Sequence, residues 1–419
     1  MHNGKQKGSL FLYNIGQLIT MAGGPKKGSA MGDIGLIEGP AVLVIEDGIV
    51  TYAGKQSEAP CPKEHGMEFV DARGQCVLPG FIDSHTHLVF GGYREDEFQW
   101  RLAGESYMSI MERGGGIAST TKATRVATLE QLADKATAHL DDMLKMGVTT
   151  VEAKSGYGMD RETEIRQLEV TRHLEATHPI SLYSTYMGAH DTPAEYKGRP
   201  HEYIDFIIRE MLPLVKEKRL AECVDIFTEK NVFEHDDTRR LLNAAKEYGF
   251  KVKMHADEIV HIGGADLAAE LGCLSADHLL KVSDEGIKAL ASSETVATCL
   301  PLTAFSLMDD YAPARKMIDE GCYVAVASDL NPGSCFSSSI PLLIALSTIY
   351  MKMTVEETLT ALTINAAKAI DRHNAIGSLE VGKAGDAVIL KYPSYKFLSY
   401  HFGMNLVDTT IKNGITYKF

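Results

Sequence analysis

Residues 76–375 alternate short apolar runs with longer amphipathic patterns, and this alternation restricts the fold more than any other feature of the chain. Strand-length runs separated by helical patterns are typical of βαβ units around a parallel sheet. Helices are predicted, for example, at residues 129–146, 162–176, 237–248 and 284–291. Eight candidate strands are found, at residues 81–87, 149–154, 182–190, 224–229, 251–255, 273–278, 295–300 and 323–329. Eight such units predict an α/β fold with a closed (β/α)8 TIM barrel, which takes about 250 residues.

The two ends of the chain carry a different pattern, in which short apolar runs are separated by tight turns. Asp47-Gly48 and Asn413-Gly414 are typical two-residue hairpin turns between such runs. The predicted strands lie at residues 11–15, 41–45, 49–53 and 387–390, with a hairpin within 407–417. We therefore expect residues 1–75 and 376–419 to form one small β-sandwich domain that brackets a barrel domain at 76–375.

Composition argues against two classes of partner. The chain has 42 basic and 56 acidic residues and a formal net charge of -14, so it lacks the basic excess that binds nucleic-acid phosphates. The longest apolar run, residues 340–351, is too short to span a bilayer and contains Ser347 and Thr348. Seven cysteines without CxxC spacing favour free thiols in a reducing compartment. We expect a cytoplasmic protein that binds neither nucleic acid nor a membrane.

Side chains suited to metal binding stand at the ends of five predicted strands. His85 and His87 are two residues apart, so on a strand they point the same way, and their neutral nitrogens suit zinc, iron or nickel. Active sites of barrels are built from the carboxyl ends of the strands, so these side chains should meet in one cleft. A single buried histidine is usually a packing residue, but five such strand ends favour a metal site. The full set is His85, His87, His190, His255, His278 and Asp329.

Several motifs strengthen this interpretation. One group is VLPGFIDSHTH from Val77, VASD ending at Asp329, TINAAKAI and GSLEVGKAGDAVIL; it resembles the metal-dependent amidohydrolase superfamily. A narrower group is HTHLVFGGYRE, ERGGGIAST, EAKSGYG, YMGAHDTPAEY, KMHADE, SADH and SDLNPGS; it resembles the imidazolonepropionase family. The resemblance covers nearly the whole chain. It implies a homodimer that opens the ring of 4-imidazolone-5-propanoate, giving N-formimidoyl-L-glutamate in histidine degradation.

The resemblance also implies roles for individual residues. One Zn2+ or Fe3+ per chain would be held by His85, His87, His255 and Asp329. The substrate's propionate would bind the planar guanidinium of Arg94, since that group fits a carboxylate with two parallel hydrogen bonds. Further substrate contacts are implied for Tyr107, Tyr157, His190, Glu258, Asn331, Gly333 and Ser334.

Opening a cyclic amide requires a nucleophile, a polarised carbonyl and a proton for the leaving nitrogen. A metal lowers the pKa of bound water from 15.7 to about 7, and we expect this water to attack the carbonyl. The candidates for proton transfer are Asp329, His278 and Glu258, and the sequence does not decide which of them performs each transfer. It also does not decide whether the metal is zinc or iron. Lys154 and Glu229, the candidates for bridging a second metal, are interpreted as structural groups of the barrel mouth.

Two other functions fit the same metal-type residues. Another amidohydrolase reaction, such as deamination of an aminated heterocycle or hydrolysis of a different cyclic amide, would share them, although Arg94 and Tyr157 favour a substrate with an acidic side chain. A catalytically silent scaffold would have lost a ligand, and none is missing from the sequence. Tyr93 and Leu302 differ from the expected family pattern, and we expect them to narrow the cleft.

Overall fold

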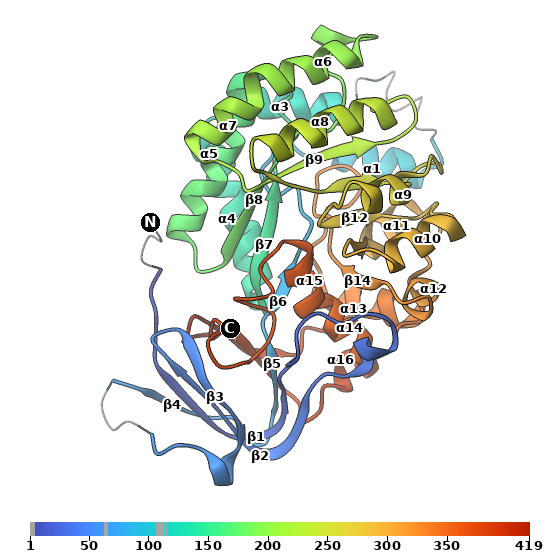
Figure 1. Ribbon diagram of the computed structural model, residues 1–419. Coiled ribbons are helices and arrows are strands. Elements are labelled where there is room, and N and C mark those ends of the chain that lie inside the picture. The colour runs from blue at the N-terminus through green and yellow to red at the C-terminus, as the bar shows by residue number, and fades with distance from the viewer. Residues whose placement is uncertain (1–4, 63–65, 106–112, 114) are drawn as a thin grey trace.

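The computed structural model describes residues 5–62, 66–105, 113 and 115–419, and its main body is a parallel barrel (Figure 1). The predicted eight barrel strands are confirmed, in the order β14-β13-β12-β11-β9-β8-β7-β6. The fifth strand is split into two pieces at Lys253. The strands are β6 (Phe81–Asp83), β7 (Val148–Lys154), β8 (Ser181–Ala189), β9 (Cys223–Thr228), β10 (Lys251–Val252), β11 (Met254–Ala256), β12 (Ser275–His278), β13 (Val296–Cys299) and β14 (Tyr323–Val326).

The barrel closes between its first and last strands through residues that lie beyond both. The prediction that strands continue through 81–87 and 323–329 is wrong, because β6 ends at Asp83 and β14 at Val326. The two segments nevertheless stay side by side, with a parallel bridge between Thr86 and Leu330. The backbone N–H of Asp329 donates to the carbonyl of His85 at 3.0 Å, and that of His87 donates to the carbonyl of Leu330 at 2.9 Å. The segments that carry three predicted ligands therefore form the seam of the barrel.

Helices cover the outside of the barrel, with α5 against β8 and α8 against β9 (Figure 1). None of the helices in the described part of the chain is long and apolar enough to cross a membrane. The barrel helices are α1 (Glu95–Leu102), α3 (Ile117–Val126), α4 (Leu129–Lys145), α5 (Arg161–Thr177), α6 (Pro200–Phe206), α7 (Leu212–Lys218), α8 (His235–Glu247), α9 (Gly264–Glu270), α10 (Asp284–Ala291), α11 (Pro301–Leu307), α12 (Ala314–Asp319), α13 (Ile340–Ile349), α14 (Val355–Leu362) and α15 (Ile364–Ala369).

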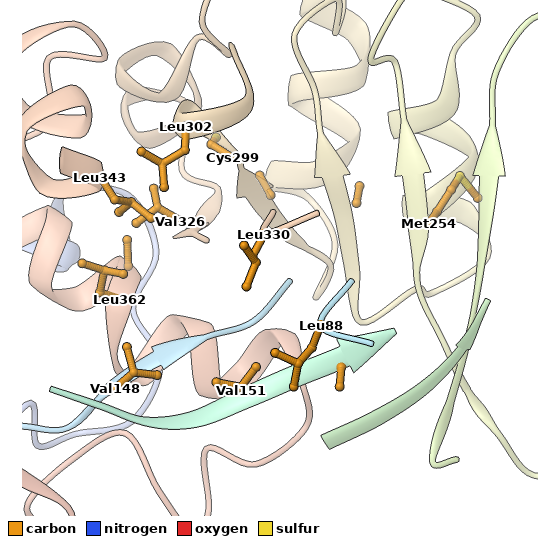
Figure 2. Close-up of a cluster of buried hydrophobic side chains, with 14 of the residues drawn as sticks. Leu88, Val148, Val151, Met254, Cys299, Leu302, Val326, Leu330, Leu343 and Leu362 are labelled. Carbon is orange, nitrogen blue, oxygen red and sulfur yellow. The ribbon is translucent and has the colours of Figure 1, made fainter. Parts of the chain in front are cut away.

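Apolar side chains from strands and helices fill the space between the two layers. Figure 2 shows part of this cluster, in which Val326 of β14 and Cys299 of β13 lie near Leu302 of α11 and Leu343 of α13. Leu302 is 2% exposed. Its side chain therefore belongs to the packing of the barrel wall.

The two chain ends form a separate eight-stranded sheet, as predicted, with its own apolar core. Its order is β17-β16-β15-β5-β1-β2-β3, with β4 paired to β1. Both predicted hairpin turns are present, and all four of their residues, Asp47, Gly48, Asn413 and Gly414, have positive φ, as type I′ turns require. The strands are β1 (Leu10–Ile19), β2 (Leu36–Glu46), β3 (Ile49–Lys55), β4 (Glu68–Asp71), β5 (Cys76–Pro79), β15 (Ala387–Leu390), β16 (Val407–Lys412) and β17 (Ile415–Lys418); a short helix, α16 (Phe397–Tyr400), precedes β16.

Strands β5 and β15 attach this sheet to the barrel through the alternation of their side chains. Val77 and Ile389 point into the core of the sheet, whereas their neighbours Leu78 and Val388 point into the barrel core. Leu78 and Val388 are also partners in the β5–β15 ladder. Because β5 belongs to the sheet of the chain ends, we propose that the boundary between the two domains lies at Gly80.

Replacing Leu78 with alanine should weaken the junction between sheet and barrel. Leu78 is 0% exposed, so the variant should lower the free energy of unfolding by about 2–5 kcal/mol through lost burial and a cavity. Urea unfolding followed by circular dichroism measures this. The control Leu36→Ala, at a side chain 37% exposed on β2, should change stability by less than about 0.5 kcal/mol. Equal effects of the two substitutions would contradict the proposed junction.

Candidate metal centre and active site

Four histidines and one aspartate meet at the carboxyl end of the barrel. The Nε2 atoms of His255 and His87 are 3.4 Å apart, and Asp329 Oδ1 lies 3.4 Å from His85 Nε2 and 3.7 Å from His87 Nε2. Two overlapping groups each have candidate ligand atoms within 4.8 Å of one another. One is His85, His87 and Asp329, and the other is His85, His255 and His278. All five side chains are buried. The prediction that these strand ends converge is confirmed.

Two of these imidazoles have a carboxylate beside Nδ1, which leaves Nε2, the nitrogen that faces the cluster, suited to a metal. His85 Nδ1 lies 2.7 Å from Asp277 Oδ2, so it carries the proton and leaves a lone pair on Nε2. That buried Nε2 atom has no hydrogen-bond partner among the described residues. His255 Nδ1 lies 3.1 Å from Asp225 Oδ2, which is within ion-pair distance but without hydrogen-bond geometry. Neutral imidazoles oriented by carboxylates, with lone pairs facing a shared carboxylate, fit a bound metal cation.

A layer of buried charges lies within the barrel beneath these histidines. Lys154 Nζ contacts Glu152 at 3.1 Å and Asp225 at 2.7 Å, and Lys253 Nζ contacts Glu152 at 2.6 Å and Asp277 at 3.4 Å. All five side chains are 0% exposed. Strands β7 and β12 are not neighbours in the sheet, so the contact of Lys154 with Asp277, at 3.6 Å, crosses the barrel interior. We call these residues the buried charge layer.

Lys154 and Glu229 both have structural partners. Burial lowers the pKa of Lys154, but the three carboxylates around it raise that pKa by more. The pKa therefore lies well above its ordinary value, and the side chain is an ammonium. Glu229 accepts hydrogen bonds from the backbone N–H groups of Lys230, Ile259 and Val260. Glu229 therefore holds the loop that follows His255.

Asp329 is held by Thr303 and by an unusual backbone conformation. The Thr303 hydroxyl donates to Asp329 Oδ2 at 2.7 Å, which leaves Oδ1 facing the histidines. Asp329 has φ +54° and His278 has φ +79°, a left-handed region that is uncommon for residues other than glycine and recurs at functional sites. Burial raises the pKa of Asp329 to about 7 and lowers that of His278 to about 3.

Glu258 faces His278 across the mouth of the site. Its Oε1 lies 3.5 Å from His278 Nδ1. Burial, together with the charges of Asp329 and Glu229, raises the pKa of Glu258 well above its ordinary value. Asp277, the residue before His278, bonds to His85 and not to His278. A carboxyl group with a raised pKa and a neutral imidazole therefore stand side by side.

A cavity of about 510 Å³ opens above the cluster, and Arg94 is among its lining residues. We call the part of the cavity around Arg94 its basic end. Arg94 reaches this end from the start of α1, where its Nε donates to the buried Glu97 Oε2 at 2.8 Å. Tyr157 is also buried there, and burial raises its pKa, so it stays a neutral hydroxyl. His190 stacks on His87, with ring centres 4.6 Å apart and planes inclined by 10°. A ligand in this cavity could reach both the histidines and the guanidinium.

The loop after the last strand lines the same cavity, but its polar groups partly bond to one another. Asn331 Oδ1 accepts the N–H groups of Gly333 and Ser334, each at 2.8 Å, and its Nδ2 donates to the Ser334 hydroxyl at 2.9 Å. A Cβ at Gly333 would lie 2.0 Å from Arg94 Nη1, so glycine is required for the guanidinium to pack there. The turn organised by Asn331 thus shapes the basic end of the cavity.

The remaining expectations concern three residues. Tyr107 lies outside the described residues. Tyr93 and Leu302 line a neighbouring apolar cavity of about 490 Å³ rather than the cavity above the histidines. The expectation that they narrow the active cleft is therefore wrong. Leu302 packs in the barrel wall instead, and Tyr93 is half exposed.

Sequence reasoning missed the groups that orient the predicted residues. These are Asp225 and Asp277, which orient histidines, Thr303, which orients Asp329, and Glu97, which orients Arg94. For the aspartates a signal was present, because a charged residue inside an apolar strand such as CVDIFT is rare unless it is paired. For Thr303 we find no comparable signal.

Comparison with known proteins identifies the family. The sequence profile of the Amidohydrolase family matches residues 76–416. An imidazolonepropionase of Porphyromonas gingivalis is 66% identical over 97% of this chain and 96% of that protein. Those of Parabacteroides distasonis and Clostridium tetani are 55% and 54% identical, over 98% and 99% of this chain and 99% of each protein. The chain belongs to the imidazolonepropionase family of amidohydrolases.

Solved structures of more distant amidohydrolases share the fold of this imidazolonepropionase-family chain. A 5-methylcytosine deaminase from Klebsiella pneumoniae has a TM-score of 0.73 at 16% identity, covering 98% of both chains. An adenosine deaminase from Xanthomonas campestris with bound zinc has a TM-score of 0.69 at 17% identity, covering 99% of this chain and 93% of that one. The barrel and the sheet of the chain ends are thus the fold of these proteins as well.

Substitution of Lys154 by methionine should destabilise the protein strongly. The change leaves Glu152, Asp225 and Asp277 with Lys253 as the single buried ammonium of the layer, and breaking such a buried pair costs about 3–5 kcal/mol. The free energy of unfolding in urea is the measurement. Lys145→Met, which removes an exposed partner of Asp142, should leave it unchanged. A Lys154→Met protein as stable as the wild type would show that the buried ion pairs are not required.

Proposed function

We propose that the protein hydrolyses 4-imidazolone-5-propanoate to N-formimidoyl-L-glutamate in histidine degradation. The observation that carries this proposal is one cavity lined both by the metal-type cluster and by Arg94. A ring carbonyl can then lie at the cluster while the propionate meets the guanidinium. The name of the relatives in the same family supports the choice of this cyclic amide.

The proposed metal ligands are His85, His87, His255 and Asp329, holding one zinc or iron ion per chain. When bound there, such an ion would activate water and polarise the ring carbonyl. The ion pairs of Lys154 support a single-metal site, because an ammonium engaged by carboxylates is not free to bridge a second ion. The lone pair of His85 Nε2 and the 3.4 Å approach of His255 to His87 support this set.

Substrate binding is proposed to use the basic end of the cavity. Arg94 would bind the propionate with its two terminal nitrogens, since Nε is already engaged by Glu97. Tyr157 would add a neutral hydroxyl donor, and His190, stacked on His87, would border the ring. Tyr107 is proposed as a further contact. Asn331, Gly333 and Ser334 would complete the wall.

Proton transfer is proposed to run along His278 and Glu258. His278 is a neutral imidazole that can accept a proton from the attacking water, and Glu258 Oε1 stands 3.5 Å from its Nδ1. Glu258, with its raised pKa, can hold a proton and donate it to the departing ring nitrogen. Such hydrogen bonds often shorten only when substrate binds. Asp329 Oδ2, fixed by Thr303, would act as a further acceptor.

The assembly and location predicted from the sequence belong to the same proposal. A homodimer in the cytoplasm would suit a metabolic hydrolase. All seven cysteines are free thiols, which agrees with a reducing compartment. Sedimentation equilibrium of the purified protein measures the oligomeric state, and two chains per particle is the expected result.

Metal removal should abolish the proposed activity. Freshly generated 4-imidazolone-5-propanoate should lose its ultraviolet absorbance quickly with metal-replete protein and only at the spontaneous rate with chelator-treated protein. Adding zinc or iron back in separate samples identifies the working metal by the recovered rate. A protein that binds one metal per chain yet leaves this substrate untouched would overturn the substrate assignment, and heterocyclic amines would then be tested for deamination.

Glu258→Gln should lower kcat by a factor of about 10² to 10⁴, because glutamine keeps the size of the side chain and cannot supply the proton. Metal content, measured by atomic emission, should not change. Glu285→Gln, at an exposed position in the first turn of α10, is the matched control and should keep full activity. Wild-type kcat in the Glu258 variant would exclude this residue from proton transfer.

A further inference from the structure

A second arginine, Arg101, stands on the same face of α1 as Arg94 and Glu97. The three residues are spaced i, i+3 and i+7, which places them on one side of a helix, and all three line the cavity above the histidines. Arg101 lies outside the sequence motifs on which the site was predicted. Its position seven residues after Arg94 brings it to the basic end of the cavity.

One of the two terminal nitrogens of Arg101 has a partner and the other has none. Nη2 donates to the carbonyl of Gly333 at 2.9 Å. Nη1 is buried and makes no hydrogen bond within the described part of the chain. A buried donor on a charged group is costly to leave without a partner, so such an atom indicates a place for a ligand. The ligand must be an acceptor, because a guanidinium offers only donors.

The two arginines converge on one glycine. Arg94 Nη1 lies so close to Gly333 that a Cβ there would come within 2.0 Å of it, and Arg101 Nη2 bonds to the carbonyl of the same residue. Burial, and after it the positive charge of Arg94, lowers the pKa of Arg101 from its ordinary value, while the charge of Glu97 acts in the opposite direction. Both guanidinium groups therefore border the same small region.

The charges in this region leave a surplus that suits a single carboxylate. Glu97 pairs with Arg94 at 2.8 Å, and Glu105 pairs with Arg113 at 3.0 Å. Arg101 has no carboxylate within 4.0 Å among the described residues. One net positive charge thus remains at this end of the cavity, and one propionate would balance it.

We propose that Arg101 is a second carboxylate-binding residue, which donates Nη1 to the substrate's propionate beside Arg94 and sets the preference for an acid over a neutral side chain. The proposal rests on the proposed function for the identity of the substrate. The proposal requires less than the proposed function does, because it needs only the binding of a ligand with a propionate group at this end of the cavity.

Binding of two stable ligands, imidazole-4-propanoate and imidazole-4-propanamide, tests the proposal by calorimetry without turnover. The wild-type protein should prefer the acid, and Arg101→Met should reduce that preference at least about tenfold, the scale of one charge-assisted hydrogen bond. Arg101→Lys should recover part of it. The control Arg209→Met, at an exposed arginine of the segment between α6 and α7, should keep the full preference.

Three results would overturn the proposal. An Arg101→Met protein that keeps the wild-type preference would exclude a contact with the carboxylate. Equal weakening of both ligands would show that Arg101 only holds the loop through the carbonyl of Gly333. A wild-type protein without any preference for the acid would also overturn it. If the preference depends on Arg101 but 4-imidazolone-5-propanoate is not hydrolysed, the proposed function fails and this inference stands.

Discussion

The buried charge layer is the constraint on which the site depends. Two lysines and three carboxylates are removed from water inside the barrel, and such a set is stable only while each charge keeps its partners. Two of the carboxylates, Asp225 and Asp277, also lie against imidazoles, and the hydrogen bond between Asp277 and His85 fixes which nitrogen of that histidine carries the proton. Stability and ligand orientation are therefore properties of one network.

The seam of the barrel ties this network to the last strand. His85 and Asp329 contribute side chains to the cluster while their backbones bond to each other across the closure. Thr303, at the start of α11, then selects which oxygen of Asp329 faces the histidines. A shift of the seam would move His85 and Asp329, two proposed ligands, together. The distance between their side chains would therefore stay constant.

Sequence patterns predicted the barrel because each strand and helix has its own local periodicity, and they predicted the site because parallel strands end at one rim. The predicted length of the two strands at the seam was wrong, since residues 84–87 form an isolated bridge and no continuous ladder. Lys253 stands at the break between β10 and β11, and its side chain bonds to Ser84 and Glu152, contacts that no local pattern contains. Side-chain partners such as Thr303 and Asp329, or Arg101 and Gly333, are likewise set by folding of distant segments.

The junction at Gly80 has a consequence for how ligands enter and leave. Strand β5 of the outer sheet runs into β6 of the barrel with this single residue between them, and its N–H bonds to Asp386 of the same sheet. Leu78 and Val388 are packed into the barrel core on the same side. At this crossing the described chain has no linker about which one domain could swing relative to the other. We therefore expect exchange of substrate and product to depend on the loops at the barrel rim and not on a hinge at Gly80.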